Sequence, residues 1–372
     1  MFSVGRPTRA EIDLSAIRHN VKALKSLTRP GARFCAVVKA DGYGHGAAQV
    51  AAEALSAGAD FLAVAVLDEA LILRAAGFTG PILILGYTPP QQAHLVAENG
   101  LSQTIFNLQQ AEALSQAAEA LGLLAKVHLK VDTGMGRLGV PPGQAADFAV
   151  GADRCRNLLI EGVFTHFATA DSRDKTYALK QFAAFKEALS AIEGRGISIP
   201  IRHAANSAAL LDLPETHLDM VRAGIALYGL WPSEETGRPI ELKPAMRFKT
   251  VIAQLKEVPA GTALSYGCTY VTPAPARIAT LPVGYADGWT RRLSGRARVL
   301  VGGRSAPLVG RICMDQCLAD VSAIEGLREG DEVLLFGGPE LPAEEPAALL
   351  ETINYEITCM VHKRVPRVYL GG

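Results

Sequence analysis

The chain has 372 residues, and lysine plus arginine equals aspartate plus glutamate at 37 each. This balance argues against a nucleic-acid or membrane-surface protein. Hydrophobic residues make up 49% of the chain, as in ordinary globular proteins, and a chain of this length usually forms two domains.

The N-terminus and the cysteines indicate the cellular compartment. Charged residues between Arg6 and Asp13 come too early for a signal peptide, and no run of about twenty apolar residues could span a bilayer. The six cysteines form no CxxC pair, so we expect free thiols rather than a disulfide framework or a zinc site. We therefore expect a soluble cytoplasmic protein that needs no metal.

Short apolar runs alternate with amphipathic segments as far as residue 223. The apolar runs predict strands at 34–39, 61–66, 82–85, 103–106, 126–131, 159–165, 200–203 and 219–223. The segments between them predict helices that include 46–57, 67–76, 107–121 and 174–190. Strands that alternate with helices imply parallel βαβ units, and eight strands in about 200 residues favour a (β/α)8 barrel over an open sheet.

The pattern changes after residue 231. The stretch WPSEETGRPIELKP is rich in proline, glycine and charge, which is typical of a linker. Beyond it, β-branched runs lie between glycine and proline turns, at 248–258, 276–283, 297–301 and 332–336. We therefore predict a barrel domain at 1–240 and a mostly β domain at 241–372.

The stretch FCAVVKADGYGHG (34–46) ends a predicted strand on Lys39. At the carboxyl end of a barrel strand, where barrel enzymes carry their chemistry, partial burial lowers the pKa of a lysine and frees its amine to attack a carbonyl. The following glycines allow a ligand close to the backbone, and Tyr43 can offer its hydroxyl to an anion. The alternative is a structural ion pair of Lys39 at the barrel rim.

Other predicted strands also end in polar residues. These are Lys130 and Arg137 in HLKVDTGMGRLG, His166 in FTHFATAD, His203, Asn206 and Ser207 in HAANSAAL, and Arg222, Gly224 and Ile225 in DMVRAGIALYG. Each has a structural alternative, such as a core histidine, a helix cap or an ion pair. Together they favour a site, because the loops after the last two strands of such barrels often bind phosphate. A lysine beside a phosphate site is typical of pyridoxal phosphate.

The predicted β domain has candidates of its own, although tyrosines in such domains usually serve packing. They are Tyr266 in ALSYGCTY, Tyr285 in VGYADG, Cys313, Met314 and Asp315 in GRICMDQ, and Tyr355 in INYEITC.

With these motifs the chain resembles the alanine racemase family. The resemblance runs in the family's order through AVVKADGYGHG, HLKVDTGMGRLG, THFATAD, ANSAA, VRAGIALYG, SYG, VGYADG, ICMDQ and INYEI. It implies a (β/α)8 barrel, a C-terminal β domain, pyridoxal phosphate as cofactor, alanine as substrate and a homodimer that shares its active sites. The sequence leaves open whether the product supplies D-alanine for peptidoglycan or serves the breakdown of alanine.

The resemblance also implies a role for each motif residue. Lys39 holds the cofactor as a Schiff base, and Arg222 faces the pyridine nitrogen. The other cofactor residues are Tyr43, His166, Asn206, Ser207, Gly224, Ile225 and Tyr355, of which Tyr43, Ser207, Tyr355 and the backbone of Gly224 and Ile225 hold the phosphate. Arg137 and the backbone N–H of Met314 bind the substrate carboxylate, and Tyr285 limits the substrate side chain. The supporting residues are Lys130, often carbamylated in this family, with His203, Cys313 and Asp315.

Racemisation needs two groups on opposite faces of the substrate's Schiff base. The resemblance assigns Lys39 to the D enantiomer and Tyr266, from the partner's β domain, to the L enantiomer. Tyrosine is a poor base at neutral pH unless its phenolate is stabilised, and cationic Arg222 and His166 can do this. Arginine cannot accept the ring proton, so the cofactor stays a weaker electron sink, which suits a racemase.

Other functions remain open on the sequence alone. A related barrel racemase acts on serine, lysine or several amino acids, although Tyr285 and Tyr355 favour a small side chain. A pyridoxal decarboxylase shares the barrel and the lysine but is not expected to have the SYG and ICMDQ motifs in this arrangement. A non-catalytic carrier of pyridoxal phosphate is expected to lack the second domain.

Overall fold

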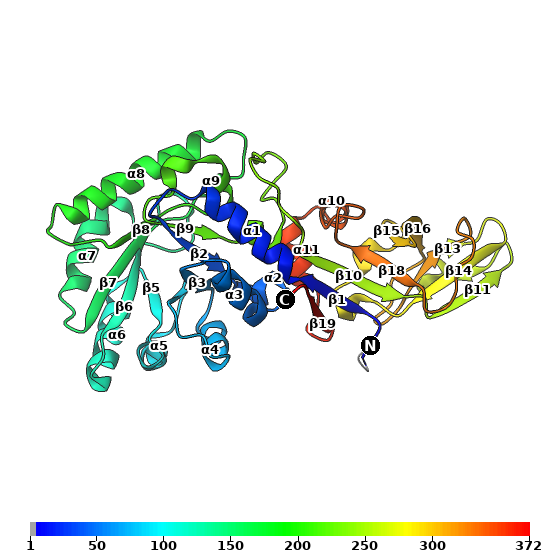
Figure 1. The fold of residues 1–372 in the computed structure, drawn as a ribbon, viewed down its shortest axis with the longest axis horizontal. Coiled ribbons are helices and arrows are strands. Elements are labelled where there is room, and N and C mark those ends of the chain that lie inside the picture. Colours follow the sequence, from blue (N-terminus) through cyan, green and yellow to red (C-terminus); the bar gives the residue numbers. More distant parts are fainter. Residues whose placement is uncertain (1–4) are drawn as a thin grey trace. The chain divides into compact units, whose positions relative to one another are not determined.

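The computed structural model describes residues 5–372 and divides into two compact units (Figure 1). The first unit, called the barrel unit below, comprises residues 17–42 and 47–242. The second, called the β unit, comprises residues 243–372, residues 43–46 and the described residues up to Ala16. The predicted boundary at 240/241 lies beside the division after Leu242, but the sequence did not assign the N-terminal segment or residues 43–46 to the β unit.

Eight parallel strands form the centre of the barrel unit, in the order β8-β7-β6-β5-β4-β3-β2-β9. Their bounds are β2 Arg33–Val37, β3 Phe61–Val64, β4 Ile82–Ile84, β5 Ser102–Ile105, β6 Ala125–Lys130, β7 Leu158–Phe164, β8 Ile201–His203 and β9 Met220–Ala223. The end strands β8 and β9 come together through bonds from Asp219 N to Arg202 O and from Arg222 N to Ala205 O, each 3.0 Å. The eight predicted strands and the barrel are confirmed.

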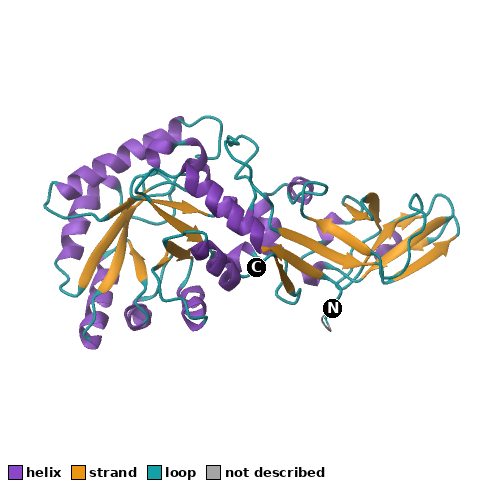
Figure 2. Cartoon of the chain, in the orientation of Figure 1, coloured by secondary structure: helices purple, strands orange, loops and turns teal. Residues whose placement is uncertain are grey.

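Helices surround these strands in the barrel unit (Figures 1 and 2). They are α1 Leu14–Leu27, α3 Ala47–Ser56, α4 Leu67–Ala75, α5 Ala93–Glu98, α6 Leu108–Leu121, α7 Ala145–Asp153, α8 Thr176–Glu193 and α9 Ser207–Asp212, and the segment labelled α2, Lys39–Tyr43, is a left-handed turn. Short 3-10 turns lie at η1 Pro90–Gln92, η2 Pro142–Gln144, η3 Pro214–Thr216 and η4 Ile225–Tyr228. Local sequence sets the ends of α6, because Asn107 caps its start and Gly122 adopts a left-handed φ of 66° at its end.

The interior of the barrel is apolar along most of each strand but polar in one region. The strand residues Phe34, Ile82 and Val127 are fully buried, as expected for a parallel sheet covered by helices. His128, Lys130, His203 and Arg222 are buried as well. Buried polar groups cost free energy unless they have partners, so these four need a specific explanation.

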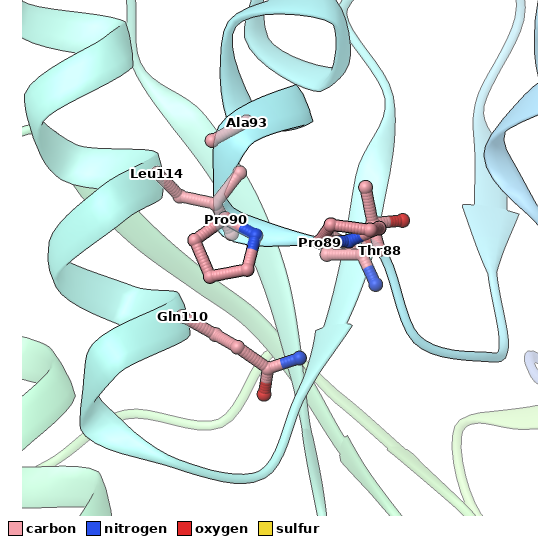
Figure 3. A pocket seen from close by; sticks show the side chains of 7 residues that line it. Thr88, Pro89, Pro90, Ala93, Gln110 and Leu114 are labelled. Atoms are coloured by element: carbon pink, nitrogen blue, oxygen red, sulfur yellow. The ribbon is translucent and has the colours of Figure 1, made fainter.

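A small cavity lies beside β5, and none of these four polar residues lines it (Figure 3). It is lined by Thr88, Pro89, Pro90, Ala93, Gln103, Gln110 and Leu114. The buried Nε2 of Gln110 has no hydrogen-bond partner among the described residues. The space available to the centre of a water molecule is about 10 Å³, which suits one ordered water rather than a substrate.

Nine strands of the described residues form the main sheet of the β unit, in the order β11-β14-β17-β16-β15-β18-β10-β1-β19. They are β1 Arg9–Asp13, β10 Met246–Val251, β11 Gln254–Val258, β14 Ala276–Leu281, β15 Arg298–Val301, β16 Arg304–Val309, β17 Cys317–Asp320, β18 Glu332–Phe336 and β19 Arg367–Leu370. The short strands β12 Ala263–Leu264 and β13 Tyr270–Val271 pair separately, and the helices are α10 Glu344–Leu350 and α11 Asn354–Met360.

The N-terminal strand explains why residues distant in sequence belong to the β unit. β1 pairs antiparallel with β10 and parallel with β19, so it joins two strands from the other end of the chain. The single predicted run at 248–258 is two strands, β10 and β11, which pair with different neighbours. Within residues 5–372, no helix has both the length and the apolar character needed to cross a membrane.

Candidate active site

Lys39 begins a left-handed turn directly after the first barrel strand. Positive φ angles of 52°, 51°, 61° and 51° occur at four consecutive residues, Ala40, Asp41, Gly42 and Tyr43. Such a conformation costs roughly 1–2 kcal/mol per non-glycine residue. A turn of this kind needs compensating bonds, and strained backbone of this type is concentrated at functional sites.

Two carboxylates supply those bonds. Glu69 on α4 accepts from the backbone N–H of Ala40 at 2.6 Å and from that of Ala65 at 2.7 Å. Asp41 accepts from the N–H of Ala47 at 2.8 Å, where α3 begins. The turn is therefore tied to the starts of both following helices, and Lys39 is held at its first residue. Sequence reasoning missed Glu69.

Lys130 and Arg222 lie over the same aromatic ring. Lys130 Nζ is 4.3 Å from the centroid of Phe164, and the guanidinium carbon of Arg222 is 5.3 Å from it. Burial, followed by the charges of Arg222 and Arg137, holds the pKa of Lys130 well below its usual value. Burial also lowers the pKa of Arg222, to about 10. Both side chains thus lie in a poorly solvated place that disfavours their charged forms.

Four basic side chains lie close enough to His166 to influence its pKa. Burial lowers the pKa of its ring well below the usual value. The remaining causes are all positive charges, from Arg222, Lys130, Arg137 and Lys39. These groups belong to three barrel strands, β2, β6 and β9, or to the loops that follow them, so these predicted residues lie near one another. Within residues 5–372, Lys130, Arg137 and Arg222 form no ion pair with a carboxylate, a charge distribution that suits an anionic ligand.

Arg222 is held by hydrogen bonds to uncharged acceptors. Its Nη2 donates to the carbonyl oxygens of Thr165 at 2.9 Å and Ala204 at 3.0 Å. The same nitrogen lies 3.3 Å from His166 Nδ1, and Nη1 lies 2.9 Å from His203 Nδ1. The guanidinium is therefore fixed in orientation by the strands β7, β8 and β9.

Ser207 joins the two turns that follow the last strands. Its Oγ accepts from the N–H of Gly224 at 2.8 Å and from that of Ala226 at 3.4 Å. Asn206 is the residue that caps α9, because its side chain accepts from Ala209 N at 3.0 Å. Ser207 is thus not the helix cap that the sequence also allowed; it links α9 to the start of η4, next to Ile225.

The β unit has a separate group of predicted residues. Tyr266, Tyr285 and Met314, here called the exposed cluster, have 66%, 40% and 52% of their surface exposed. Large apolar side chains with this exposure are candidates for contact with a partner or ligand.

Backbone contacts hold the three loops of the exposed cluster together. Ser265 Oγ donates to Arg311 O at 2.6 Å, which links the loop of Tyr266 to the loop that carries Cys313 and Met314. Tyr285 N donates to Cys313 O at 3.0 Å. A Cβ at Gly284 would lie only 2.3 Å from that same oxygen, so this close approach requires glycine.

Asp287 stabilises the loops that carry the exposed cluster. Its fully buried carboxylate accepts from Arg6 Nη2 at 2.8 Å, from Arg364 Nε at 2.6 Å and from Gly284 N at 2.9 Å. Arg364 also pairs with Asp315 at 2.8 Å, so that predicted residue supports the same loops. Burial alone would raise the pKa of Asp287, but the hydrogen bonds from the two arginines and the glycine lower it.

Tyr43 and Tyr355, both assigned to phosphate binding, lie together in the β unit. Their ring centroids are 6.1 Å apart with an angle of 54° between the planes. Nearby in sequence, the Gly44 carbonyl accepts from Arg367 Nε at 2.9 Å, and a Cβ at Gly44 would lie 2.2 Å from Thr358 O. These contacts explain why residues 43–46 belong to the β unit although they follow the first barrel strand.

The predicted residues therefore form groups within each unit. The barrel unit gathers Lys39, Lys130, Arg137, His166, His203 and Arg222, with Asn206, Ser207, Gly224 and Ile225 at the last two turns. The β unit gathers Tyr266, Tyr285, Cys313, Met314 and Asp315, and separately Tyr43 with Tyr355. The sequence reasoning missed His128, Glu161 and Asp287. A charged residue in the apolar strand LLIEGVF was the available signal for Glu161.

Comparison with known proteins gives one answer. Family models described as "Alanine racemase, N-terminal domain" and "Alanine racemase, C-terminal domain" match residues 12–232 and 245–369. The chain is 59% identical over 370 residues to the alanine racemase of Desulfovibrio desulfuricans, covering 100% of both, and 53% identical over 376 residues to that of Desulfosudis oleivorans, covering 98% of this chain and 96% of the relative.

Solved structures agree. The alanine racemase of Clostridium difficile 630 aligns with a TM-score of 0.96 and 42% identity, covering 99% of this chain and 97% of that one. The alanine racemase of Bacillus anthracis with bound L-Ala-P aligns with a TM-score of 0.94 and 40% identity, covering 100% of this chain and 97% of that one.

Proposed function

The chain belongs to the alanine racemase family, and from that premise we propose which of its residues carry the interconversion of L-alanine and D-alanine. The observation that supports the proposal most directly is the set of basic side chains around His166, which belong to three barrel strands or the loops after them. Of these, Lys130, Arg137 and Arg222 have no carboxylate partner among the described residues. An amino-acid carboxylate and a phosphate group are the anions that such a site would bind.

Pyridoxal phosphate fits this donor set. Lys39 would hold the cofactor covalently through Nζ, and Ser207 with the N–H groups of Gly224 and Ile225 would hold its phosphate. Arg222 would face the pyridine nitrogen; as a group that only donates, it leaves that nitrogen unprotonated. When bound, the cofactor acidifies the Cα proton of the substrate by delocalising the electron pair left behind.

The family relationship adds further cofactor ligands. We assign Tyr43 and Tyr355 to the phosphate, which their mutual contact in the β unit supports. His166 and Asn206 complete the set, His166 as a neutral ring because burial holds its pKa low. His203 supports Arg222 from behind, through the bond of 2.9 Å between them.

Arg137 would bind the substrate carboxylate together with the backbone N–H of Met314. Lys130 lies next to two arginine charges, and its lowered pKa favours the neutral amine that reacts with carbon dioxide. The carbamate would be an anion that orients Arg137, which replaces a repulsive contact by an attractive one.

Two side chains would handle the proton at Cα. Lys39 Nζ would remove or return it on one face, and Tyr266 Oη on the other. Tyrosine needs a nearby cation to act as a base at neutral pH, and Arg222 with its hydrogen-bonded histidine is the candidate. Tyr285, with Tyr355, would restrict the side chain of the substrate to a small group.

A second copy of the chain would complete each site. Tyr266, Tyr285 and Met314 are exposed although they are large and apolar, so we propose that the β unit of one protomer contributes them to the barrel of its partner. The six free cysteines support a reducing, cytoplasmic location.

Chiral analysis of alanine tests the assignment of the two bases. The purified enzyme with pyridoxal phosphate should bring either pure enantiomer to equal amounts of both, and Lys39→Ala and Tyr266→Phe should each abolish this. Retained activity in either variant would refute the role of that residue.

Mixing the two inactive variants tests the shared site. In a dimer with exchanged residues, a Lys39→Ala protomer supplies Tyr266 to the intact barrel of a Tyr266→Phe protomer. Refolded from an equal mixture, half of the dimers would have one working site, so about a quarter of wild-type activity should return. No recovery despite mixed-dimer formation would place both residues of each site in one protomer.

A further inference from the structure

Arg222 is a buried cation that forms no ion pair with a carboxylate within residues 5–372. Only 3% of its surface is exposed, and the groups it donates to are two carbonyl oxygens and two imidazole rings. A buried charge without a counter-charge is strongly destabilising. The fold must therefore offset the charge of Arg222 in another way.

A continuous hydrogen-bonded path leads from Arg222 to a carboxylate. Arg222 Nη1 lies 2.9 Å from His203 Nδ1, and His203 Nε2 lies 2.8 Å from His128 Nδ1. His128 Nε2 in turn lies 3.1 Å from Glu161 Oε2, which also accepts from the hydroxyl of Ser102. The path runs through β9, β8, β6 and β7, and both histidine rings are fully buried.

The chemistry of the guanidinium gives this path one direction. An arginine can only donate, so His203 Nδ1 must be the acceptor and the proton of the neutral ring must be on Nε2. That N–H donates to His128 Nδ1, which puts the proton of the second ring on Nε2 as well. The last group of the path must then be an acceptor, and Glu161 Oε2 is placed to be that acceptor.

Local structure is arranged around this path. The pairing of β6 with β7 skips one residue: Val127 faces Ile160, and His128 faces Gly162. The skipped residue is Glu161, and such bulges re-aim a side chain. A Cβ at Gly162 would lie 2.5 Å from His128 Nδ1, so the histidine ring needs glycine there.

Stacking fixes the second ring of the path. The ring of Phe164 lies parallel to that of His203, with centroids 4.7 Å apart and planes 8° apart. This is the same phenylalanine that lies beneath Lys130 and Arg222. The orientation of His203, and with it the atom that faces Arg222, is therefore held by packing as well as by hydrogen bonds.

We propose that Glu161 is the counter-charge of Arg222, acting through His128 and His203 as positioning residues locked in their Nε2–H forms. The path fixes the charge and orientation of the Arg222 guanidinium. That this guanidinium faces the cofactor nitrogen rests on the proposed function.

The electrostatics of the three groups are consistent with this arrangement. Burial alone would raise the pKa of Glu161, but the hydrogen bonds from His128 and Ser102, followed by the electrostatic effects of His128 and Lys126, bring it to about 2. Burial lowers the pKa of His128, with partial compensation by Glu161, and burial followed by the charge of Arg222 lowers that of His203 much further. An ionised Glu161 with two neutral rings is the result.

A local role for Glu161 is the competing explanation. Its other oxygen lies 3.7 Å from Lys126 Nζ, which is 44% exposed, so the carboxylate could serve that surface lysine alone. The two explanations differ in the protonation states and tautomers that they require of His128 and His203. They also differ in whether Glu161 and Arg222 are energetically coupled.

Nuclear magnetic resonance of the cofactor-free protein tests the protonation pattern directly. With ¹⁵N-labelled histidine, both rings should give the signals of neutral Nε2–H tautomers at pH 7, assigned with the single variants His128→Gln and His203→Gln. A charged ring, or an Nδ1–H tautomer at either position, would overturn the proposal. Because no cofactor is present, this result is independent of the racemase assignment.

A double-mutant cycle on the cofactor-free protein tests the coupling. Glu161→Gln retains an acceptor but removes the charge, and we expect it to lower the thermal unfolding midpoint by about 2–4 °C. In an Arg222→Gln background, Glu161→Gln should lower the unfolding midpoint by less than half as much. An equal drop in both backgrounds would overturn the proposal.

Two controls make the cycle specific. Glu53 on α3 allows the same substitution as Glu161 and has a similar exposure, with 15% of its side chain exposed against 13% for Glu161. Unlike Glu161, it pairs with Arg18 and contacts neither histidine. Glu53→Gln should therefore have the same effect with and without Arg222. The coupling between Glu161 and Arg222 should also persist in Lys126→Met; its loss there would assign Glu161 to the surface lysine.

Discussion

Acidification from pH 7 to pH 5.5 should destabilise the barrel unit through its buried histidines. Burial is the largest cause that lowers the pKa of four of them, His128, His166, His203 and His217. A histidine of depressed pKa binds fewer protons folded than unfolded. Its contribution to stability is therefore complete above the unfolded value of about 6.5 and is lost as the pH falls below it.

The size of the loss follows from this linkage. A histidine that takes up no proton in the folded state loses about 1.2 kcal/mol over this interval, given an unfolded pKa of about 6.5. His166 and His203, whose pKa values lie well below normal, should each lose this full amount, and His128 and His217 at most the same. The total is then between about 2.5 and 5 kcal/mol.

Carboxylates contribute little in this interval. The folded pKa of Glu161 is about 2, because the hydrogen bonds from His128 and Ser102 and the electrostatic effects of His128 and Lys126 outweigh the opposing effect of burial. A carboxylate of depressed pKa stabilises above its unfolded value of about 4.3 and loses that contribution only as the pH falls further. Carboxylates therefore contribute less than the histidines to the loss between pH 7 and 5.5.

Urea unfolding of the cofactor-free protein at the two pH values measures the difference. His203→Gln should reduce the pH-dependent loss by about 1.2 kcal/mol, whatever its effect on stability at pH 7. His94→Gln, at an exposed position of α5, should leave the loss unchanged. Equal stability at pH 7 and 5.5 would refute the reasoning, since it would require the buried rings to accept protons as readily as the unfolded chain.

Three further predictions concern residues that hold the site. Asp287→Asn should leave two arginines without their buried anion, destabilise the β unit by about 3 kcal/mol and lower kcat through Tyr285; unchanged unfolding and kinetics would contradict this. ¹³C-bicarbonate should give a carbamate resonance that Lys130→Met removes, and removal of carbon dioxide should raise KM through Arg137. Glu69→Ala should cost about 2 kcal/mol by releasing the left-handed turn, seen as a lower unfolding midpoint, and an unaltered midpoint would show that the turn holds without it.

The sequence by itself determined the barrel and pointed to most of the residues proposed for the site. Its eight apolar runs coincide with the eight strands, because strands buried on both faces need continuous apolar character. Lys39 and Arg222 were recognisable because a charged residue within such a run needs a reason to be there. This information lies in the local sequence around each residue, so it does not depend on the tertiary structure.

Only the tertiary structure decided features that depend on two distant segments. β1 belongs to the β unit because its edges match β10 and β19, which no local pattern encodes. The path from Arg222 to Glu161 depends on which nitrogen of each ring faces its neighbour, and on the bulge of one residue in β7 that re-aims Glu161. Hydrogen bonds across strands are set by register and ring orientation, so the sequence could name His203 but could not connect it to Glu161.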